Sequence, residues 1–334
     1  MKRIQINAIL IILLFMIIAC GSNKFDVDVS GIKVEIDIKR LDKDIMVNYP
    51  DTPDVIKLNN NYGEFLELYS IYIIQAGDVY QRDFALNLMD FNKYCHEFRI
   101  PGKVDEIFGD LSGLKKGLTE AFQYYKYYFP EKKVPQVYTY LSNFSISVVT
   151  DESGLGIGLD KYLGTNCELY KNLGLENYKI AKMHKEMLPI DCMRAFAQSD
   201  FPYNDSVNNM VNQMVYEGKI QYFIDAMFPF APDSLKFGYS QQQFEWADNN
   251  EREMWTYLVE HELLFSSDEL SIRKMISDGP FTTLFANNSA PRAGAYLGWK
   301  IVHRYMEKNP GVSFADLMKN DDYQGILNAA SYKP

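Results

Sequence analysis

The stretch from residue 204 to residue 229, NDSVNNMVNQMVYEGKIQYFIDAMFP, constrains the fold most, because its pattern predicts one long helix. Apolar residues recur along it at three- and four-residue steps, Asp205 or Ser206 is expected to cap its N-terminus, and Pro229 ends it. Helical geometry places the carboxylate of Glu217 on or beside the apolar stripe. A carboxylate removed from water needs a cation, a metal or several hydrogen-bond donors. The stripe is formed by Val207, Met210, Met214, Gln221 and Ile224.

Glu217 lies in the segment YEGKIQYF, residues 216–223, which resembles the segment E-G-x-A-E-Y-F/V of a family of zinc-dependent peptidases. In that family the glutamate is the third metal ligand, downstream of a helix with H-E-x-x-H, so the resemblance implies a zincin-like core. The zinc motif itself is missing, because no two histidines stand four residues apart on one helix. We therefore expect a degenerate core with no metal, no cofactor and no catalytic residue. The histidines of the chain are His96, His184, His261 and His303.

An arginine is the expected partner of the Glu217 carboxylate. The helix predicted for residues 189–201 lies where the peptidases carry their histidine pair, and its apolar face includes Arg194. A planar guanidinium pairs with a carboxylate at two points and keeps its proton. We hypothesise that an ion pair of Arg194 with Glu217 replaces the zinc ion. Two plainer alternatives stay open, in which Arg194 extends to water or Glu217 reaches solvent from the edge of the stripe.

The N-terminus is typical of a secretion signal. A basic start precedes an uncharged apolar run from residue 8 to residue 19, which is shorter than the roughly 20 residues that a transmembrane helix needs. The residues IIAC, which end at Cys20, resemble the bacterial lipobox, whose cysteine is lipidated and becomes the first residue of the mature protein. A cleaved signal with a coincidental Cys20 is the alternative.

A lipidated Cys20 implies that acyl chains anchor the protein to a membrane. No acidic cluster that would resemble a surface-export tag follows the cysteine, so we expect the protein to face the periplasm. The expected organisation is a signal peptide at residues 1–19, a lipidated tether at 20–30 and a single large domain at 31–334. The helical front part of that domain is expected to extend to about residue 130, and its zincin-like part to begin at about residue 135.

Charge and cysteine content exclude two classes of protein. The formal net charge is −10 and no block of Lys or Arg follows the signal, which argues against nucleic acid as a partner. Cys95, Cys167 and Cys192 are the cysteines after Cys20, and their odd number leaves at least one free thiol in an oxidising compartment. A disulfide framework is therefore not expected to hold the fold, and the 47% of hydrophobic residues suffice for a large core.

The order of the predicted elements indicates an α+β fold that is predominantly helical and contains a small mixed sheet. A strand is predicted at residues 32–39, and a hairpin of residues 136–141 and 144–149 is followed by a third strand at 155–160. Helical patterns fill the rest. The helices expected before the hairpin span about 54–76, 80–99 and 104–129, and those after residue 229 span about 231–236, 241–265 and 267–277.

The glycine-rich segment LGIGLDKYLG, residues 155–164, is predicted to be an exposed edge strand beside a cleft. It resembles the segment before the metal helix in zincin-like peptidases, whose edge strand holds an extended substrate by main-chain hydrogen bonds. The resemblance implies a groove for an extended peptide. The residues of this candidate peptide-groove strand are Leu155, Gly156, Ile157 and Gly158.

The segment SAPRAGAYLGWKIV, residues 289–302, opens the last long helix. Gly294 and Gly298 share one face of it, which favours a tight crossing with another helix. The segment also resembles the downstream P-x-x-x-G-Y-x-x-G pattern of the peptidases, with Tyr296 at the tyrosine position. Tyr296 therefore joins Glu217 and Arg194 as a candidate residue of the degenerate site.

Several motifs resemble those of the GldB family of gliding-motility lipoproteins of Bacteroidetes. They are the lipobox, the strand with the following KRLDKD at 39–44, the block DGPFT at 278–282, the segment 292–302 and the closing ASYKP at 330–334. The resemblance covers essentially the whole mature chain. It implies an envelope protein that is needed for gliding, that works with the type IX secretion machinery and that has no established chemistry.

The sequence thus predicts an inactive, peptidase-like lipoprotein that acts by binding. Its expected partners are other gliding and secretion proteins of the envelope, and an extended peptide is a candidate ligand. Two alternatives stay open: a hydrolase with a non-standard site, and a plain structural scaffold without a peptide groove.

Overall fold

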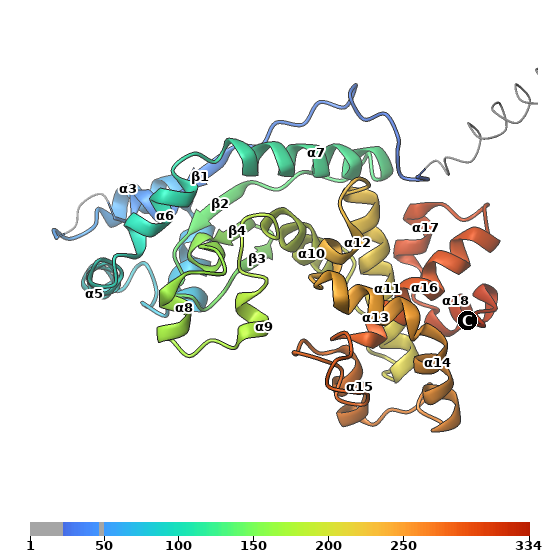
Figure 1. Cartoon of the computed structure of the whole chain (residues 1–334). Coiled ribbons are helices and arrows are strands. Elements are labelled where there is room, and N and C mark those ends of the chain that lie inside the picture. Colours follow the sequence, from blue (N-terminus) through green and yellow to red (C-terminus); the bar gives the residue numbers. More distant parts are fainter. Residues whose placement is uncertain (1–22, 47–49) are drawn as a thin grey trace, which may run out of the picture.

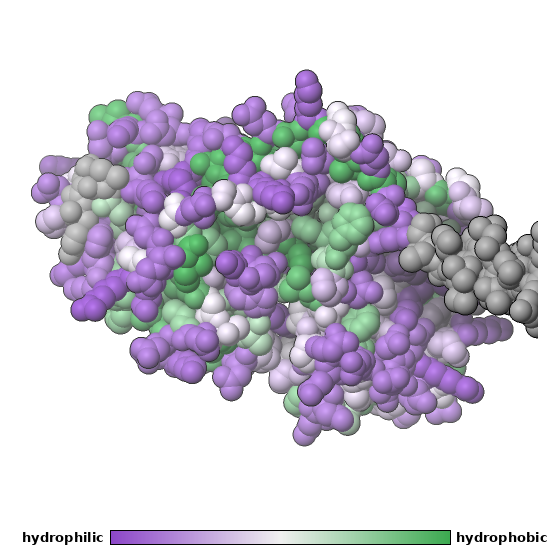
Figure 2. All heavy atoms as spheres, turned by 45° about the horizontal axis from the view of Figure 1, so that its top comes forward, coloured by the Kyte–Doolittle hydropathy of each residue, from purple (hydrophilic) through white to green (hydrophobic). Residues whose placement is uncertain are grey.

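The computed structural model describes residues 23–46 and 50–334, so the candidate lipidation site Cys20 lies outside the described residues. The fold is α+β and predominantly helical, as predicted, with one small mixed sheet in the N-terminal half (Figure 1). Helix α7 (Ser112–Tyr128) runs along one side of the molecule, from the sheet region toward the helices of the C-terminal half. Figure 2 shows the molecule with the α7 side turned toward the viewer, and on this face hydrophilic side chains surround smaller hydrophobic patches.

The sheet consists of β1 (Ile38–Arg40), β2 (Val137–Tyr140), β3 (Val148–Asp151) and β4 (Gly154–Gly158) in the order β1-β2-β4-β3. The β1–β2 and β2–β4 pairs are parallel, and β3 is antiparallel to β4. The predicted hairpin of residues 136–141 with 144–149 is wrong, because β4 lies between these two strands. The first predicted strand, at 32–39, begins only at residue 38.

The loop between β2 and β3 explains why these strands do not pair. Asn143 and Phe144 both have left-handed backbone conformations, with φ of 53° and 62°. The buried carboxylate of Asp160 accepts hydrogen bonds from the backbone N–H groups of Ser142, at 3.0 Å, and Phe144, at 2.7 Å. The loop is therefore folded onto Asp160 instead of forming a tight turn between neighbouring strands.

Strand β4 is interior, so the predicted exposed edge at residues 155–158 is wrong. All residues of β4 are buried, and a strand lies on each side of it. A Cβ atom at Gly156 would lie 2.7 Å from the ring of Phe65 and 2.9 Å from the ring of Tyr140. Phe65 in turn stacks on Tyr138, with ring centroids 4.0 Å apart. The glycines of β4 thus make room for aromatic rings on one face of the sheet, not for an incoming backbone.

The front helices enclose these rings in a hydrophobic cluster of their own. The predicted helix 54–76 is divided at Gly63, which has φ of 50°, and the predicted helix 104–129 is divided after residue 108. The elements before β2 are α2 (Leu41–Asp44), α3 (Val55–Tyr62), α4 (Glu64–Leu68), a π-helix (Tyr69–Ile73), α5 (Phe84–Glu97), α6 (Ile100–Phe108) and α7.

The other face of the sheet belongs to the main hydrophobic core, which continues into the C-terminal half. Helix α10 (Leu188–Asp200) corresponds to the helix predicted at 189–201, and it packs against β3 and against helix α11 (Met210–Met227). The shorter elements between the sheet and α10 are a 3-10 helix (Leu159–Tyr162), α8 (Glu168–Asn172) and α9 (Asn177–Ile180).

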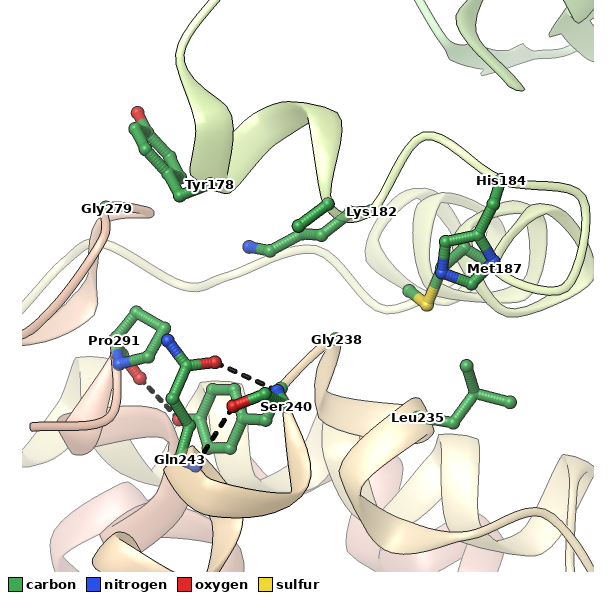
Figure 3. A pocket seen from close by; sticks show the side chains of 12 residues that line it. Tyr178, Lys182, His184, Met187, Leu235, Gly238, Ser240, Gln243, Gly279 and Pro291 are labelled. Atoms are coloured by element: carbon green, nitrogen blue, oxygen red, sulfur yellow. Dashed lines mark hydrogen bonds between the residues drawn. The ribbon is translucent and has the colours of Figure 1, made fainter. Parts of the chain in front are cut away.

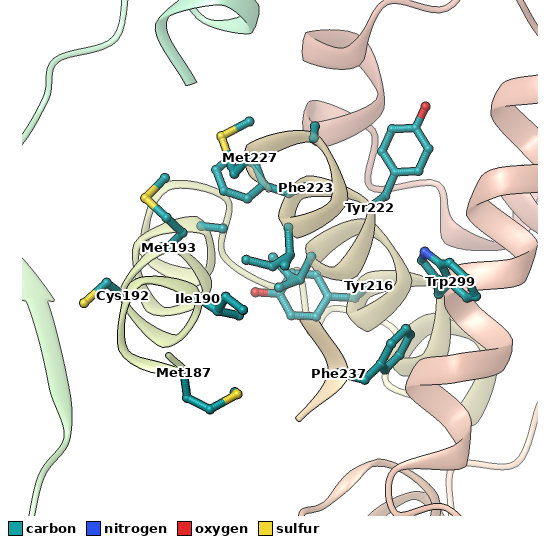
Figure 4. Packing of buried hydrophobic residues seen from close by; sticks show 14 of the residues in the cluster. Met187, Ile190, Cys192, Met193, Tyr216, Tyr222, Phe223, Met227, Phe237 and Trp299 are labelled. Atoms are coloured by element: carbon teal, nitrogen blue, oxygen red, sulfur yellow. The ribbon is translucent and has the colours of Figure 1, made fainter. Parts of the chain in front are cut away.

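Helix α11 (Met210–Met227) is the central element, and it packs between α10 and α16 (Ala293–Lys308) (Figures 1 and 4). The predicted start at Asp205 or Ser206 is wrong, because the helix begins after Asn209, whose side chain accepts the backbone N–H of residue 212. Val207, which we assigned to the apolar stripe, is 55% exposed. All residues of α11 except Gln213 are buried, so the helix is enclosed on every side and is not amphipathic.

Helix α16 crosses α11 closely, as the spacing of Gly294 and Gly298 predicted. A Cβ atom at Gly298 would lie 1.6 Å from the carbonyl oxygen of Met214 on α11. The predicted helix 241–265 is divided at Asn250. The remaining helices are α12 (Asp233–Phe237), α13 (Gln241–Asn249), α14 (Glu251–Glu260), α15 (Glu269–Ile276), α17 (Phe314–Lys319) and α18 (Tyr323–Ala330).

Residues 23–30, which we expected to be part of the tether, lie against the domain where they are described. Phe25 is only 6% exposed and packs edge-on against Tyr222, with ring centroids 5.0 Å apart. The side-chain amide of Asn23 donates to the carbonyl oxygen of Pro229 at 2.6 Å. The chain is therefore fixed to the domain within a few residues of Cys20.

The cysteines Cys95, Cys167 and Cys192 are all free thiols. Cys95 and Cys192 are fully buried, and burial raises the pKa of both thiols above its usual value. A buried thiol that keeps its proton is a weak nucleophile, so these two side chains act as small hydrophobic groups in the core.

Candidate binding site

Strand β3 is a free edge of the sheet, with β4 on one side and no strand of the described chain on the other. The N–H of Gly158 donates to the carbonyl oxygen of Ser147 at 2.8 Å. This bond shows which residues of β3 direct their main-chain groups toward β4 in the antiparallel ladder. Alternate residues of such a ladder turn their main-chain groups toward the partner, so Val149 faces β4 while Val148 and Thr150 face away. The outward-facing main-chain groups of β3 thus have no strand partner in the described chain, and α10 packs against this strand.

A pocket of about 360 Å³, here named the charged pocket, opens beside the start of β3. Ser147 and Val148 form one wall, and α10, α12 and the segments around Asp278 and Arg292 form the others. The charged side chains that line it are Lys182, Asp191, Arg194, Lys236, Asp278 and Arg292.

A second pocket, of about 260 Å³, adjoins the charged pocket and shares Lys182, Met187 and Gly238 with it. Figure 3 shows this adjacent pocket, in which Lys182 lies on the wall opposite Ser240 and Gln243. The two pockets together form one cleft between residues 178–198 and residues 235–292.

Glu217 lies in the buried part of α11, and its carboxylate accepts a hydrogen bond from Nη2 of Arg292 at 2.5 Å. The predicted ion pair of Glu217 with Arg194 is therefore wrong. Burial acts to lower the pKa of Arg292, but the negative charge of Glu217 outweighs it and the pKa is raised. Sequence spacing does not reveal this pair, because 75 positions separate the two residues and Arg292 lies outside the helix that follows it.

Arg194 instead contacts neutral groups. Its Nη2 donates to the side-chain oxygen of Gln221 at 2.7 Å and to the carbonyl oxygen of Lys236 at 2.8 Å. Its Nη1 is buried and has no hydrogen-bond partner in the described chain. Burial lowers the pKa of Arg194 to about 10, and repulsion by the neighbouring Arg292 acts in the same direction. No ion pair among the described residues includes this guanidinium.

One face of α11 therefore holds both arginines. Glu217 and Gln221 are four residues apart and lie one above the other on the helix. The first residue holds Arg292, which precedes α16, and the second holds Arg194 of α10. The polar residues of α11 thus position two cations at one wall of the charged pocket.

The other charged side chains of the pocket have polar partners of their own. Lys182 pairs with Asp278 at 2.5 Å, and Lys236 pairs with the buried Asp225 at 3.2 Å. Asp191 accepts a hydrogen bond from a tyrosine hydroxyl at 2.8 Å, while burial raises the pKa of this carboxyl. Among the cations of the pocket, only the guanidinium of Arg194 is bonded to neutral atoms alone.

Tyr296, the third residue predicted for the degenerate site, is directed elsewhere. Its ring is fully buried in the core, and its hydroxyl donates to Asp248 on α13 at 2.9 Å. Lys300 donates to the same carboxylate at 3.0 Å. The structure thus brings Glu217 and Arg194 to one region and holds Tyr296 by a separate polar cluster.

The histidines lie at scattered positions. His261 is exposed and contacts the carbonyl oxygen of Tyr257, and His184 contacts the carboxylate of Glu186. Within residues 23–46 and 50–334, no group of three or more His, Cys, Asp or Glu side chains is placed to hold a metal ion. The same part of the chain contains no helix with the length and hydrophobicity that a membrane span requires.

Comparison with known proteins gives one result. The model of the family described as gliding motility protein GldB matches residues 22–334. Neither the curated proteins nor the solved structures gave a match to the chain. Because the family model covers nearly all of the sequence, including the sheet, the cleft and the central helix, the chain belongs to the GldB family of gliding motility proteins.

Proposed function

We propose that this protein is a periplasm-facing envelope lipoprotein that supports gliding motility, together with the type IX secretion machinery, by binding a protein or peptide partner. Membership of the GldB family supports the link to gliding. The observation that carries the binding proposal is the free edge of β3, which runs into the charged pocket at Ser147 and Val148. An exposed strand edge beside a lined cleft is a common site for an extended peptide.

The partner adds as a further strand to the sheet. Its main chain pairs with the outward-facing groups of Val148 and Thr150, which supply affinity without regard to sequence. Its side chains alternate in direction, so every second one is directed to the same side of the sheet. Those nearest to Ser147 enter the charged pocket and supply specificity. Strand β3 takes the role that the sequence assigned to residues 155–158.

Binding without hydrolysis is part of the proposal. The carboxylate that the sequence relates to a metal ligand, Glu217, is already engaged by the guanidinium of Arg292. A carboxylate that is already bonded to a guanidinium is not free to bind a metal ion. This pairing supports the proposal that the protein is a pseudoenzyme, which binds its partner without hydrolysing it.

The attachment of residues 23–30 supports a position close to a membrane. A lipid on Cys20 is three residues from Asn23, which is bonded to the domain. Three extended residues span roughly 10 Å. The domain surface around Pro229 is therefore held within about that distance of the lipid layer, and the partner is another envelope component that reaches this layer.

Two proline substitutions in β3 test the edge. Thr150→Pro removes an N–H that faces away from β4 and leaves the pairing of β3 with β4 intact. We expect it to abolish gliding on agar when it replaces the chromosomal copy, while the thermal unfolding temperature of the purified protein stays within a few degrees of wild type. The matched Val149→Pro removes an N–H that faces β4, so we expect it to lower the unfolding temperature clearly.

A strain with Thr150→Pro that glides at the normal rate, with normal protein levels in immunoblots, would contradict binding at the β3 edge. To locate the partner, a photo-crosslinking amino acid at position 150 is compared with one at Tyr72, which is exposed and belongs to another element. A species crosslinked from both positions would count against a specific edge.

A further inference from the structure

We propose that the charged pocket binds a carboxylate group of the partner, either an Asp or Glu side chain or a peptide C-terminus, through the guanidinium of Arg194. The inference rests on the peptide-binding proposal above and names the chemical group that the pocket recognises. It follows from how the charges at the pocket are satisfied.

The two arginines of the pocket differ in one respect. Arg292 is paired with a carboxylate at 2.5 Å, whereas Arg194 donates only to an amide oxygen and a backbone carbonyl. A cation removed from water is costly unless an opposite charge accompanies it. No carboxylate of the described chain lies within ion-pair distance of Arg194. An anion from the partner would complete the site.

The position of Arg194 suits such a ligand. The side chain lines the charged pocket, and its Nη2 is already fixed by Gln221 and by the carbonyl of Lys236. These two bonds orient the guanidinium, so little conformational freedom is lost when a ligand binds. The second terminal nitrogen, Nη1, is shielded from water and has no partner in the described residues. A carboxylate in the pocket pairs with the guanidinium on the side that lines the pocket, and this charge-assisted contact is only partly solvated.

Neighbouring charges favour an anion over a cation at this position. Burial lowers the pKa of Arg194 to about 10 and repulsion by Arg292 adds to this effect, while the carboxylates of Glu217, Asp191 and Asp225 act in the opposite direction. Lys182 and Lys236 bring the cations that line the pocket to four, against the two carboxylates of Asp191 and Asp278. A negative ligand relieves the repulsion between the arginines, and a positive ligand increases it.

The charged pocket lies next to the edge strand β3. Ser147 and Val148 belong to the wall of the same pocket as Arg194, and α10 packs against β3. A peptide added to β3 therefore carries one of its side chains, or its terminal carboxylate, over the pocket. The edge supplies main-chain pairing and Arg194 supplies the selection for negative charge.

The first test uses acetate as the probe and acetamide, which has nearly the same shape without the charge, as its control. The unfolding temperature of the full-length protein in detergent micelles is measured against each. We expect a saturable rise with acetate and none with acetamide. Arg194→Gln should remove the rise, whereas Arg304→Gln, at an exposed arginine on α16, should keep it.

Equal responses to acetate in wild type and Arg194→Gln would overturn the inference. The conservative variant Arg194→Lys covers the case in which Arg194→Gln fails to fold. It keeps the charge but loses the planar fork, so we expect it to respond to acetate at higher concentrations than wild type. A response identical to wild type would also count against recognition by the guanidinium.

The second test identifies the source of the carboxylate with two libraries of random heptapeptides on phage, one with blocked and one with free C-termini. Selection on the full-length protein should enrich Asp or Glu at one position of the blocked library, or enrich only the library with free C-termini. Replacing the enriched acid by its amide should weaken binding about 10-fold or more, and Arg194→Gln should abolish the preference.

The outcomes separate the two proposals. Enriched peptides without a carboxylate, bound equally by Arg194→Gln, would overturn the carboxylate site and leave peptide binding intact. A saturable response to acetate without any enriched peptide would support the carboxylate site and contradict the peptide groove.

Discussion

Gly298 of α16 lies directly against Gly218 of α11 where the two helices cross. A Cβ atom at Gly218 would be 2.2 Å from the carbonyl carbon and oxygen of Gly298, so neither position has room for a side chain. The crossing also builds the site. Glu217 precedes Gly218 directly, and Arg292 lies just before α16, so the close contact of the backbones brings the carboxylate and the guanidinium within 2.5 Å.

We predict that Gly298→Ala destabilises the protein, because the added methyl group would overlap the carbonyl oxygen of Met214. Overpacking of this kind costs about 1 to 3 kcal/mol, and the rigid backbone neighbour places this variant at the upper end. Urea unfolding measures the loss. The matched control is Gly102→Ala in α6, where a Cβ atom meets nothing within 4 Å. There we expect a gain of roughly 0.5 to 1 kcal/mol, because alanine favours the helix. Similar behaviour of both variants would contradict the tight crossing.

Removing one member of the buried ion pair should cost more than removing both. Arg292→Met leaves the Glu217 carboxylate buried without its cation, which typically destabilises a protein by about 3 to 5 kcal/mol. The double variant Glu217→Gln with Arg292→Met removes the charge that was left behind, and we expect it to recover most of this loss. A double-mutant cycle of urea unfolding free energies measures the coupling. Additive effects of the two substitutions on the free energy of unfolding would show that the ion pair contributes nothing to stability.

The main helices could be predicted from the sequence because their signals are local. Periodicity located α10, α11 and α16, and the glycine spacing at 294 and 298 correctly indicated a close crossing. Glu217 is buried, as one of the two alternatives for its place on the helix predicts. The start of α11 was misplaced, since Asp205, Ser206 and Asn209 are all suitable caps and only tertiary packing selects the last.

The partners of the polar residues could not be predicted, because they come from distant parts of the chain. Arg194 was a sound candidate for Glu217 by residue type, yet it meets Gln221 one turn further along α11. The strand order could not be predicted for the same reason. The glycines of β4 fit an exposed edge or an aromatic neighbour equally well, and only the stacking of Phe65 and Tyr138 decides between them. The zincin-like relationship stays a prediction.

The carboxyl group of Asp160 should make stability fall as the pH rises from about 4 to about 6. Burial raises its pKa to about 6, although hydrogen bonds from residues 142 and 144 oppose the shift. In this range the unfolded chain, with an ordinary pKa near 3.8, loses its proton first and therefore binds fewer protons than the folded chain. The stabilisation by this group is present at low pH and is lost as the pH approaches 6. The change is on the order of 3 kcal/mol.

Unfolding free energies of wild type and Asp160→Asn between pH 4 and 7 check this sign. The stability of wild type relative to the variant should decrease as the pH rises. Asp316→Asn is the control with the opposite sign, because bonding to Ser313 lowers the pKa of the exposed Asp316 carboxyl. Measured below pH 4, its wild-type stabilisation should increase with pH, and above about pH 4 it should stay nearly constant. A constant difference between wild type and Asp160→Asn would mean that Asp160 does not titrate in this range.

The ring of Phe25 should decide how firmly the domain is held at the lipid anchor. It packs between Tyr222 and His303, and it is the buried hydrophobic side chain of the segment 23–30. In Phe25→Ala this segment should detach locally while the rest of the domain stays folded, since the helices around α11 do not depend on it. Protease added to the protein in lipid vesicles should then cleave within residues 23–30 at least about 10-fold faster, which corresponds to a loss of roughly 1.4 kcal/mol in local stability. Tyr72→Ala, at an exposed ring, should leave the cleavage rate unchanged. Equal cleavage of wild type and Phe25→Ala would mean that Phe25 does not hold the segment, and that the domain is free to move away from the membrane.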